Sequence, residues 1–196
     1  MGQKDLEKER PQEFGANPLF RNRWSPRALT GEKIVKEDFM ALFEAARWAP
    51  SSFNGQPWRF VFVTRDSERW GSFFDLLVDF NKSWAKNASV LVLVVSRMNF
   101  EYNEEFSRTH SFDTGAAWQN LALQASLSGL VAHAMGGFNH EEARVVANIP
   151  EGYEIQAMVA VGKLGKKDDL PDSLKKAEVI SGRKDFSEFV FENTMK

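Results

Sequence analysis

The stretch from Ala49 to Phe60 carries the densest set of side chains that could bind a ligand. It reads Ala-Pro-Ser-Ser-Phe-Asn-Gly-Gln-Pro-Trp-Arg-Phe, and its Ser, Asn and Gln side chains can both donate and accept hydrogen bonds. Pro50 and Pro57 stiffen the segment, and Pro57 removes one backbone donor. Fixed polar groups between two apolar segments are typical of a binding loop. An ordinary helix-to-strand connector can have the same composition.

Three other segments carry groups suited to a ligand. Arg21 to Arg27 holds three guanidiniums and the Ser25 hydroxyl, a set that suits a phosphate monoester or a solvated basic surface. Met135-Gly136-Gly137-Phe138 has paired glycines, which allow backbone to approach a ligand closely or simply to turn. Gly182 to Phe186 contains a late basic pair, which is either a second anion contact or part of an exposed tail.

Several function classes are disfavoured by what the sequence lacks. It has no Gly-x-Gly-x-x-Gly, Walker or Gly-x-Ser-x-Gly motif, and its three histidines lack metal-site spacing. It has no cysteine, which removes thiolate chemistry and fits a reducing compartment. A net charge of −2 gives no reason to expect nucleic acid or an acidic membrane as partner. The aliphatic run 90–95 is far shorter than the ~20 residues of a membrane helix. We predict no catalytic side chain and no metal ligand.

Helical and strand patterns alternate along the chain. This alternation predicts an α/β or α+β sheet with helices on its faces. At 196 residues one domain is expected, since single domains commonly run ~100–200 residues. We place a loose segment at 1–17, and the domain with a C-terminal arm at 18–196. The expected helices are 36–48, 66–79, 113–127 and 140–148, and the expected strands are 59–63, 90–95, 131–135 and 155–161.

The order of these motifs resembles that of the nitroreductase family of FMN-dependent oxidoreductases, over roughly 18–190. The run 49–60 resembles the family's Ala-Pro-Ser-Ser-x-Asn-x-Gln-Pro-Trp-x-Phe signature, and Asp113-Thr114-Gly115 followed by Gly136-Gly137-Phe138 resembles its second half. The resemblance implies an α+β fold: a three-layer α/β/α sandwich around a mostly antiparallel sheet, assembled as a homodimer. It also implies bound FMN and a cytoplasmic enzyme that uses NADH or NADPH to reduce nitroaromatics, quinones or related acceptors by a ping-pong mechanism.

The resemblance assigns residues to the phosphate end of the flavin. Arg23, Ser25 and Arg27 match the opening motif that binds the phosphate and ribityl chain. Relatives often have Arg-Arg-Ser-x-Arg, whereas Trp24 stands here in the second place, so one charge is missing. Arg183 with Lys184 resembles the late basic pair that closes on the same phosphate.

The resemblance also assigns residues to the flavin ring. Asn81 matches an Asn that bonds the pyrimidine edge, and Trp84 stands where some relatives have a Lys. The remaining predicted contacts are Pro50, Ser51, Ser52 and Asn54, which reach the flavin of the partner subunit, and Met135, Gly136 and Gly137, which lie on the side from the dimethylbenzene ring to N5.

Alternative functions keep the same fold or the same ligand. Some relatives fragment flavin or remove halogens. A non-enzymatic flavin-binding protein would fit the tryptophans at positions 24 and 84. The segment 100–112, with aromatic residues and Arg108 and His110, is either a lid over the substrate or an ordinary surface loop. The high aromatic content, 13%, fits a large core as well as a flat ligand or a subunit interface.

Overall fold

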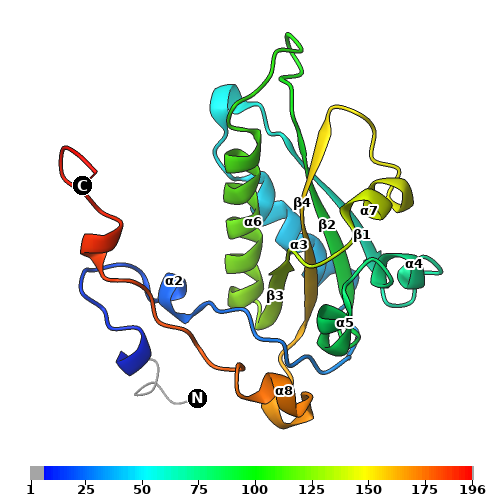
Figure 1. Cartoon of the computed structure of the whole chain (residues 1–196), viewed down its shortest axis with the longest axis vertical. Coiled ribbons are helices and arrows are strands. Elements are labelled where there is room, and N and C mark those ends of the chain that lie inside the picture. The colour runs from blue at the N-terminus through cyan, green and yellow to red at the C-terminus, as the bar shows by residue number, and fades with distance from the viewer. Residues whose placement is uncertain (1–6, 196) are drawn as a thin grey trace. The chain divides into compact units, whose positions relative to one another are not determined.

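The computed structural model describes residues 7–195. These residues divide into two compact units, one formed by 25–178 and the other by 7–24 together with 179–195. The sheet and most of the helices belong to the larger unit (Figure 1). The domain boundary expected after residue 17 stays a prediction.

The larger unit alternates helices with strands in the order that the sequence pattern indicates. Its helical elements are α3 Lys36–Arg47, η1 Ser52–Asn54, α4 Trp70–Phe74, α5 Asp79–Ala85, α6 His110–Leu127, α7 His140–Val146, η2 Lys167–Asp169 and α8 Asp172–Lys175. Its strands are β1 Trp58–Thr64, β2 Val90–Arg97, β3 Leu130–Met135 and β4 Tyr153–Lys163.

The four strands form one sheet in the order β1-β2-β4-β3, and every neighbouring pair is antiparallel. Helices α3 and α6 lie on one face, and α4, α5 and α7 lie on the other (Figure 1). The larger unit is therefore the expected α+β sandwich of three layers. The prediction of a buried central strand at 90–95 is confirmed, because β2 is buried along almost its whole length.

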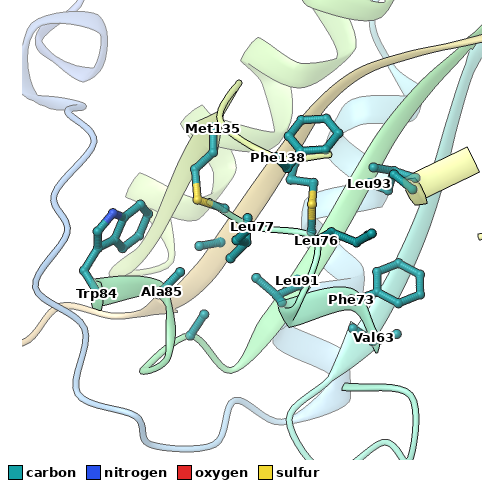
Figure 2. Packing of buried hydrophobic residues seen from close by; sticks show 14 of the residues in the cluster. Val63, Phe73, Leu76, Leu77, Trp84, Ala85, Leu91, Leu93, Met135 and Phe138 are labelled. Carbon is teal, nitrogen blue, oxygen red and sulfur yellow. The ribbon is translucent and has the colours of Figure 1, made fainter. Parts of the chain in front are cut away.

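Each face of the sheet has its own apolar core because successive strand side chains point to opposite faces. Val90, Val92 and Val94 of β2 pack towards α3 and α6. Leu91 and Leu93 pack on the other side of the sheet. Their neighbours there include Phe73 of α4 and Trp84 of α5, which Figure 2 shows. The two cores hold the strand ends and connecting loops in fixed positions.

The expected helix over 66–79 is wrong. That segment is split into the short helix α4 and a separate helix α5 that begins only at Asp79. Between them Leu77 forms a bridge with Phe138, and the Val78 N–H donates to the Gly137 carbonyl at 3.1 Å. A helix through these residues would forgo both contacts, so tertiary pairing overrides the helical spacing of the apolar residues.

Most of the other predictions of local structure agree with the structure. Gly129 has the left-handed φ of +69° expected after α6, and the Asn139 side chain caps α7 by accepting from the Glu142 N–H. Helix α6 begins at His110, three residues before the expected start at Asp113. Among the described residues no helix is long and apolar enough to span a membrane.

The smaller unit contains α2 Pro18–Asn22 and η3 Phe186–Glu188. Its N-terminal and C-terminal segments meet at an edge-to-face pair of Phe14 and Phe186, whose ring centroids are 5.0 Å apart. They also meet at Arg10, whose Nε donates to the Ser181 carbonyl at 2.7 Å. These contacts join parts of the chain that are distant in sequence.

Candidate functional site

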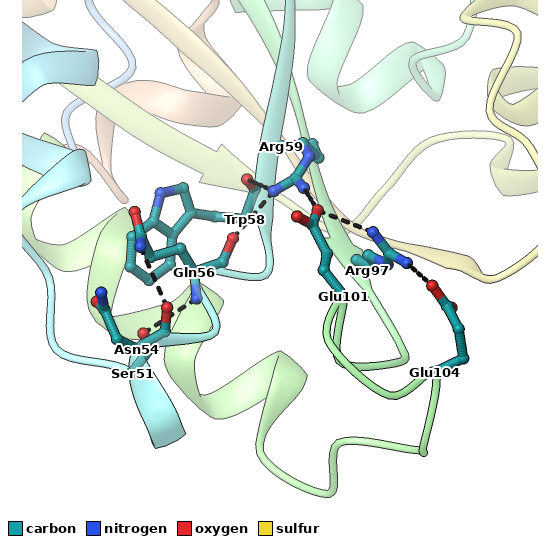
Figure 3. Close-up of polar contacts among 8 residues, drawn as sticks. All are labelled: Ser51, Asn54, Gln56, Trp58, Arg59, Arg97, Glu101 and Glu104. Atoms are coloured by element: carbon teal, nitrogen blue, oxygen red, sulfur yellow. Dashed lines mark hydrogen bonds and ion pairs between the residues drawn. The ribbon is translucent and has the colours of Figure 1, made fainter.

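The predicted binding loop is anchored on the first turn of α6. The Ser52 N–H donates to Asp113 Oδ2 at 3.1 Å, and the same oxygen accepts from Thr109 Oγ1 at 3.0 Å. Asp113 is 4% exposed, so the loop rests on a buried carboxylate. Within the loop the Gln56 N–H donates to Ser51 Oγ at 3.1 Å, a turn that Figure 3 shows. The buried packing of α6 thereby fixes the loop's position.

The loop backbone is strained where the predicted ligand contacts lie. Phe53, Asn54 and Gln56 have φ values of 50°, 53° and 44°, in the left-handed region that bulky residues avoid. Such residues persist only where the surroundings hold them, and they cluster at functional sites. Asn54 and Phe53 are exposed at this point, whereas Ser51 and Ser52 are partly buried.

A surface cavity of about 330 Å³ lies beside this loop. Its walls come from the loop and from the following strand, together with Glu101 and Tyr102 of the segment after β2. The rings of Phe53, Phe100 and Tyr102 contact one another, with centroids 5.3 to 6.5 Å apart. A Cβ on Gly55 would approach Phe100 to 3.2 Å, so the glycine permits this packing.

The segment 98–107 forms a closed turn on that aromatic cluster. The Phe100 N–H donates to the Glu105 carbonyl at 2.9 Å, and Asn99 bridges to Phe106. Ion pairs join this turn to the sheet edge: Arg59 and Arg97 both contact Glu101, at 2.5 and 2.8 Å, and Arg97 contacts Glu104 at 2.6 Å (Figure 3). Glu104 raises the pKa of the Arg97 guanidinium by hydrogen bonding.

His110 does not belong to an exposed lid. It is 7% exposed, and its Nδ1 lies 2.8 Å from Ser96 Oγ inside the unit. Glu154 Oε2 lies 3.8 Å from that same Nδ1. In a hydrolytic triad the nucleophile and the acid use different ring nitrogens, and here both use one. The cluster is therefore a buried polar network, which Gln156 extends by donating to Ser96 Oγ at 2.8 Å. Arg108, by contrast, is exposed.

Arg27 is fixed by a carboxylate that the sequence does not single out. Glu178 Oε1 accepts from the Arg27 and Ala28 N–H groups at 2.7 and 2.9 Å, and Oε2 lies 3.9 Å from Arg27 Nη1. The Arg27 guanidinium also lies over the Phe80 ring, 5.9 Å from its centroid. Phe80 directly precedes Asn81 on α5, so Arg27 contacts the helix that carries the predicted pyrimidine-edge residue.

Asn81 and Gly137 form the second group that the structure brings together. Asn81 Nδ2 donates to the Gly137 carbonyl at 2.9 Å. A Cβ on Gly137 would lie 2.8 Å from Asn81 Nδ2 and 3.0 Å from Val78, so the chain itself requires glycine there. Gly136 has open space around its missing Cβ. Met135 is 4% exposed and belongs to the core. The proximity of Gly137 to a flavin ring and that of Gly136 both stay predictions; within the chain, only position 137 requires glycine.

Trp84 has a structural role. It is 1% exposed, and its ring lies against His133 with centroids 4.6 Å apart. The nearby Lys82 lies 3.7 Å from Asp75, so its charge is paired. His133 in turn bonds the Pro26 carbonyl at 3.0 Å, which ties the segment before Arg27 to β3. The tryptophan thus helps to pack the support of the basic motif.

The other predicted basic residues lie in the smaller unit with Arg10. Burial and the nearby positive charge of Arg183 lower the pKa of Arg23. Arg183 is exposed and donates to the Ser181 and Gly182 carbonyls at 3.3 and 2.8 Å. Lys184 Nζ pairs with Glu188 at 3.4 Å. Trp24, and Ser25 of the larger unit, are partly buried. Arg23 and Arg183 thus lie close enough for their charges to interact.

The sequence does not predict the roles of three supporting residues: Arg10, Asp113 as an anchor of the loop, and Glu178. Arg10 and Glu178 bond partners more than 150 positions away, so no local spacing could reveal them. Asp113 was visible only as the start of a motif. Within residues 7–195 no group of three or more His, Asp or Glu side chains could hold a metal ion.

Comparison with known sequences and structures identifies the family. The profile of the nitroreductase family matches residues 20–79 and 75–163, which is more than half of the chain. The chain belongs to the nitroreductase family. The chain superposes on a solved oxidoreductase containing FMN with a TM-score of 0.91 and 46% sequence identity, covering 95% of this chain and 96% of that one.

Matches of the chain to curated relatives are shorter. An uncharacterized 15.4 kDa protein of Mycolicibacterium smegmatis is 37% identical over 42% of this chain and 54% of its own length. The major NAD(P)H-flavin oxidoreductase of Aliivibrio fischeri is 31% identical over 35% of this chain and 33% of its own length. These two matches thus span about half and one third of those proteins.

Proposed function

We propose that this member of the nitroreductase family is an FMN-dependent oxidoreductase that takes electrons from NADH or NADPH and reduces nitroaromatics, quinones or related acceptors. The observation that carries the proposal is the 46% identity, over nearly the whole chain, to an oxidoreductase containing FMN. The likeness to an NAD(P)H-flavin oxidoreductase supports the choice of electron donor. Bound FMN would supply the hydride and electron transfer, with donor and acceptor using one pocket in turn as a ping-pong mechanism requires.

The donor set fits the phosphate of FMN. A buried dianion needs counter-charge and hydrogen bonds, and guanidiniums supply both in a planar fork. We assign Arg23, Ser25 and Arg27 to the phosphate and ribityl chain, joined by Arg183 and Lys184. Glu178 would hold Arg27 in place through its two backbone bonds. Burial and then the positive charge of Arg183 lower the pKa of Arg23, and a bound anion would offset both.

Asn81, Met135, Gly136 and Gly137 are assigned to the flavin ring. The bond from Asn81 to the Gly137 carbonyl fixes the amide, so its oxygen can face a ligand's N–H. The open space at Gly136 would let backbone approach the ring closely.

The loop residues Pro50, Ser51, Ser52 and Asn54 are assigned to the flavin of the partner subunit of a homodimer. They belong to a segment held by Asp113 and by its own turn. We propose that Phe53, Phe100 and Tyr102 face a flat acceptor in the adjoining cavity, since aromatic faces stack on such molecules. No described side chain is placed as an acid or base, so the role of the chain is to bind and orient.

Flavin content tests the cofactor assignment. Protein purified in the presence of FMN should be yellow and release intact FMN on denaturation. A colourless protein that does not respond to added FMN would contradict the proposal. Chromatography of the flavin after many turnovers with an acceptor panel should recover FMN unchanged. Loss of FMN in step with turnover would favour a flavin-fragmenting reaction instead.

The homodimer assignment has its own test. Ser52→Ala and Asn54→Ala should each weaken FMN binding without changing the sedimentation coefficient of the assembly. A variant forced to be monomeric should lose FMN. A monomer that retains FMN at the wild-type affinity would contradict the assignment of this loop to the partner's flavin. A cytoplasmic location stays a prediction, which cell fractionation can check.

A further inference from the structure

Arg10 joins the two basic motifs of the smaller unit. Its Nε donates to the Ser181 carbonyl at 2.7 Å, and its Nη1 donates to the Arg21 and Arg23 carbonyls at 2.7 and 2.9 Å. Arg10 is only 7% exposed. One guanidinium therefore binds the backbone at the opening motif and, 171 positions away, the backbone just before Arg183.

This arrangement brings like charges together. Arg183 Nη1 donates to the same Ser181 carbonyl at 3.3 Å, so two guanidiniums share one acceptor. Burial, then Arg183 and then Arg23, lower the pKa of Arg10. Like charges this close destabilise one another, and a bound anion would offset that repulsion. Within residues 7–195, the hydrogen bonds of the Arg10 guanidinium go to the neutral backbone carbonyls of Ser181, Arg21 and Arg23, which is the pattern of a residue that positions backbone.

We infer that Arg10 is a positioning residue for the phosphate site: it ties the 21–23 backbone to Ser181, so that the Arg23 and Arg183 side chains converge on one dianionic phosphate monoester. The fork geometry explains why arginine stands there. Two nitrogens of a planar guanidinium reach three carbonyls in fixed directions, and a lysine ammonium on a flexible stem cannot replace them all.

This inference rests on the proposed function and is tested by comparing FMN with riboflavin, which differ only in the phosphate. Wild-type protein and variants are titrated with each flavin, and quenching of flavin fluorescence gives the Kd. Arg10→Ala should weaken FMN binding by at least ~10-fold, the equivalent of losing one charge-assisted contact. The Kd for riboflavin should change by less than ~2-fold. Arg10→Lys, which keeps the charge, should lie between wild type and Arg10→Ala.

Two variants separate positioning from charge and from general stability. Lys8→Ala removes an exposed cation from the same segment and should leave the FMN-to-riboflavin ratio unchanged. Phe14→Ala removes the ring contact that also joins the two segments of this unit, without touching a basic motif. It should lower thermal stability and leave the preference for FMN over riboflavin unchanged. If Arg10→Ala does not fold, Arg10→Lys with the same two controls supplies the comparison.

The other possible results of these titrations would contradict either the role of Arg10 or the proposed function. Arg10→Ala and Arg10→Lys could weaken the binding of FMN and of riboflavin equally, or Phe14→Ala could reduce the preference for FMN over riboflavin as much as they do. Either result would show that Arg10 only stabilises the unit. Unchanged FMN affinity in the folded Arg10 variants would remove the inference while leaving the proposed function intact. Wild-type protein that binds neither flavin would overturn the proposed function, and the inference with it.

Discussion

The binding loop at 51–56 and the basic cluster of Arg10, Arg23 and Arg183 are held in place by opposite means. The loop presents neutral polar groups, and a buried carboxylate on α6 fixes it. The cluster presents positive charge, and a guanidinium bonded to carbonyls fixes it. The loop's support packs into an apolar core, whereas the cluster's support consists largely of polar contacts and exposed rings. Neutral groups can therefore rely on packing, while like charges need directional bonds to stay close.

This contrast has a physical consequence for how each region responds to its ligand. The left-handed backbone angles of Phe53, Asn54 and Gln56 cost free energy whether or not a ligand is bound. The packing of the loop on α6 must offset that cost. The cluster stores repulsion, which an anion removes. We therefore expect removal of the loop's buried Asp113 anchor to act through folding stability, and changes in the basic cluster to act through affinity for a phosphate.

The largest expected effect comes from removing core support. Leu93 of β2 is fully buried, and Leu93→Ala should lower the free energy of unfolding by ~2–5 kcal/mol, because a cavity remains. Urea denaturation followed by circular dichroism measures the loss. Val145→Ala on α7, where the side chain is 79% exposed, is the matched control and should change stability by less than ~0.5 kcal/mol. A similar loss in both variants would contradict the described core.

Next in size is the loss of phosphate contacts. The double change Arg23→Ala with Arg27→Ala should weaken FMN binding by at least ~100-fold, since each charge-assisted bond contributes ~1.5–3 kcal/mol. Equilibrium dialysis against FMN gives the Kd. Arg47→Ala, an exposed arginine on α3 paired with Glu44, serves as control and should bind FMN normally. Full FMN retention in the double variant would show that the phosphate assignment is wrong.

The anchor of the loop should show a smaller effect on stability. Asp113→Ala leaves the Ser52 N–H and Thr109 hydroxyl without their shared acceptor, which should lower the free energy of unfolding by ~1–3 kcal/mol. Asp113→Asn keeps one acceptor oxygen and should recover part of the loss. Thermal and urea unfolding of the three proteins measure this order. Equal stability of wild type and Asp113→Ala would remove the anchor role.

The smallest effect concerns acid stability at exposed carboxylates. A hydrogen bond from Lys175 lowers the pKa of Asp172, and bonds from the Ser187 hydroxyl and N–H lower that of Asp185. A lowered folded-state pKa means that the stabilisation is present above the unfolded pKa. It is lost as the pH falls through the folded value, in the window below about pH 4. Asp172→Asn and Asp185→Asn should each slightly flatten the decline of thermal stability across that window. An unchanged decline in both would contradict these contacts.

Much of the fold and of the site could be predicted because the signals are local. The Asn139 cap, the left-handed Gly129 and the alternating strands each depend on neighbours in sequence. The loop at 49–60 is visible for the same reason. The helix expected over 66–79 failed because Leu77 and Val78 pair with residues near 137, a contact that helical spacing cannot reveal.

The supports of the site could not be predicted, since they act across the chain. Glu178 lies in a Lys-rich tail, and only folding brings it to Arg27. Arg10 lies among mixed charges near the N-terminus, where nothing distinguishes it from its neighbours. Trp84 was visible as a departure from the family pattern, but its burial against His133 depends on the packing of α5 on β3.

An anaerobic titration of the FMN-loaded protein tests the central claim most directly. The absorbance of the oxidised flavin at ~450 nm is followed. NADH or NADPH is added in the absence of oxygen. We expect stoichiometric bleaching by at least one nucleotide, and return of the absorbance when a quinone or nitroaromatic is added. A bound flavin that neither nucleotide reduces would contradict the claim and would leave a flavin-binding protein without this enzymatic activity.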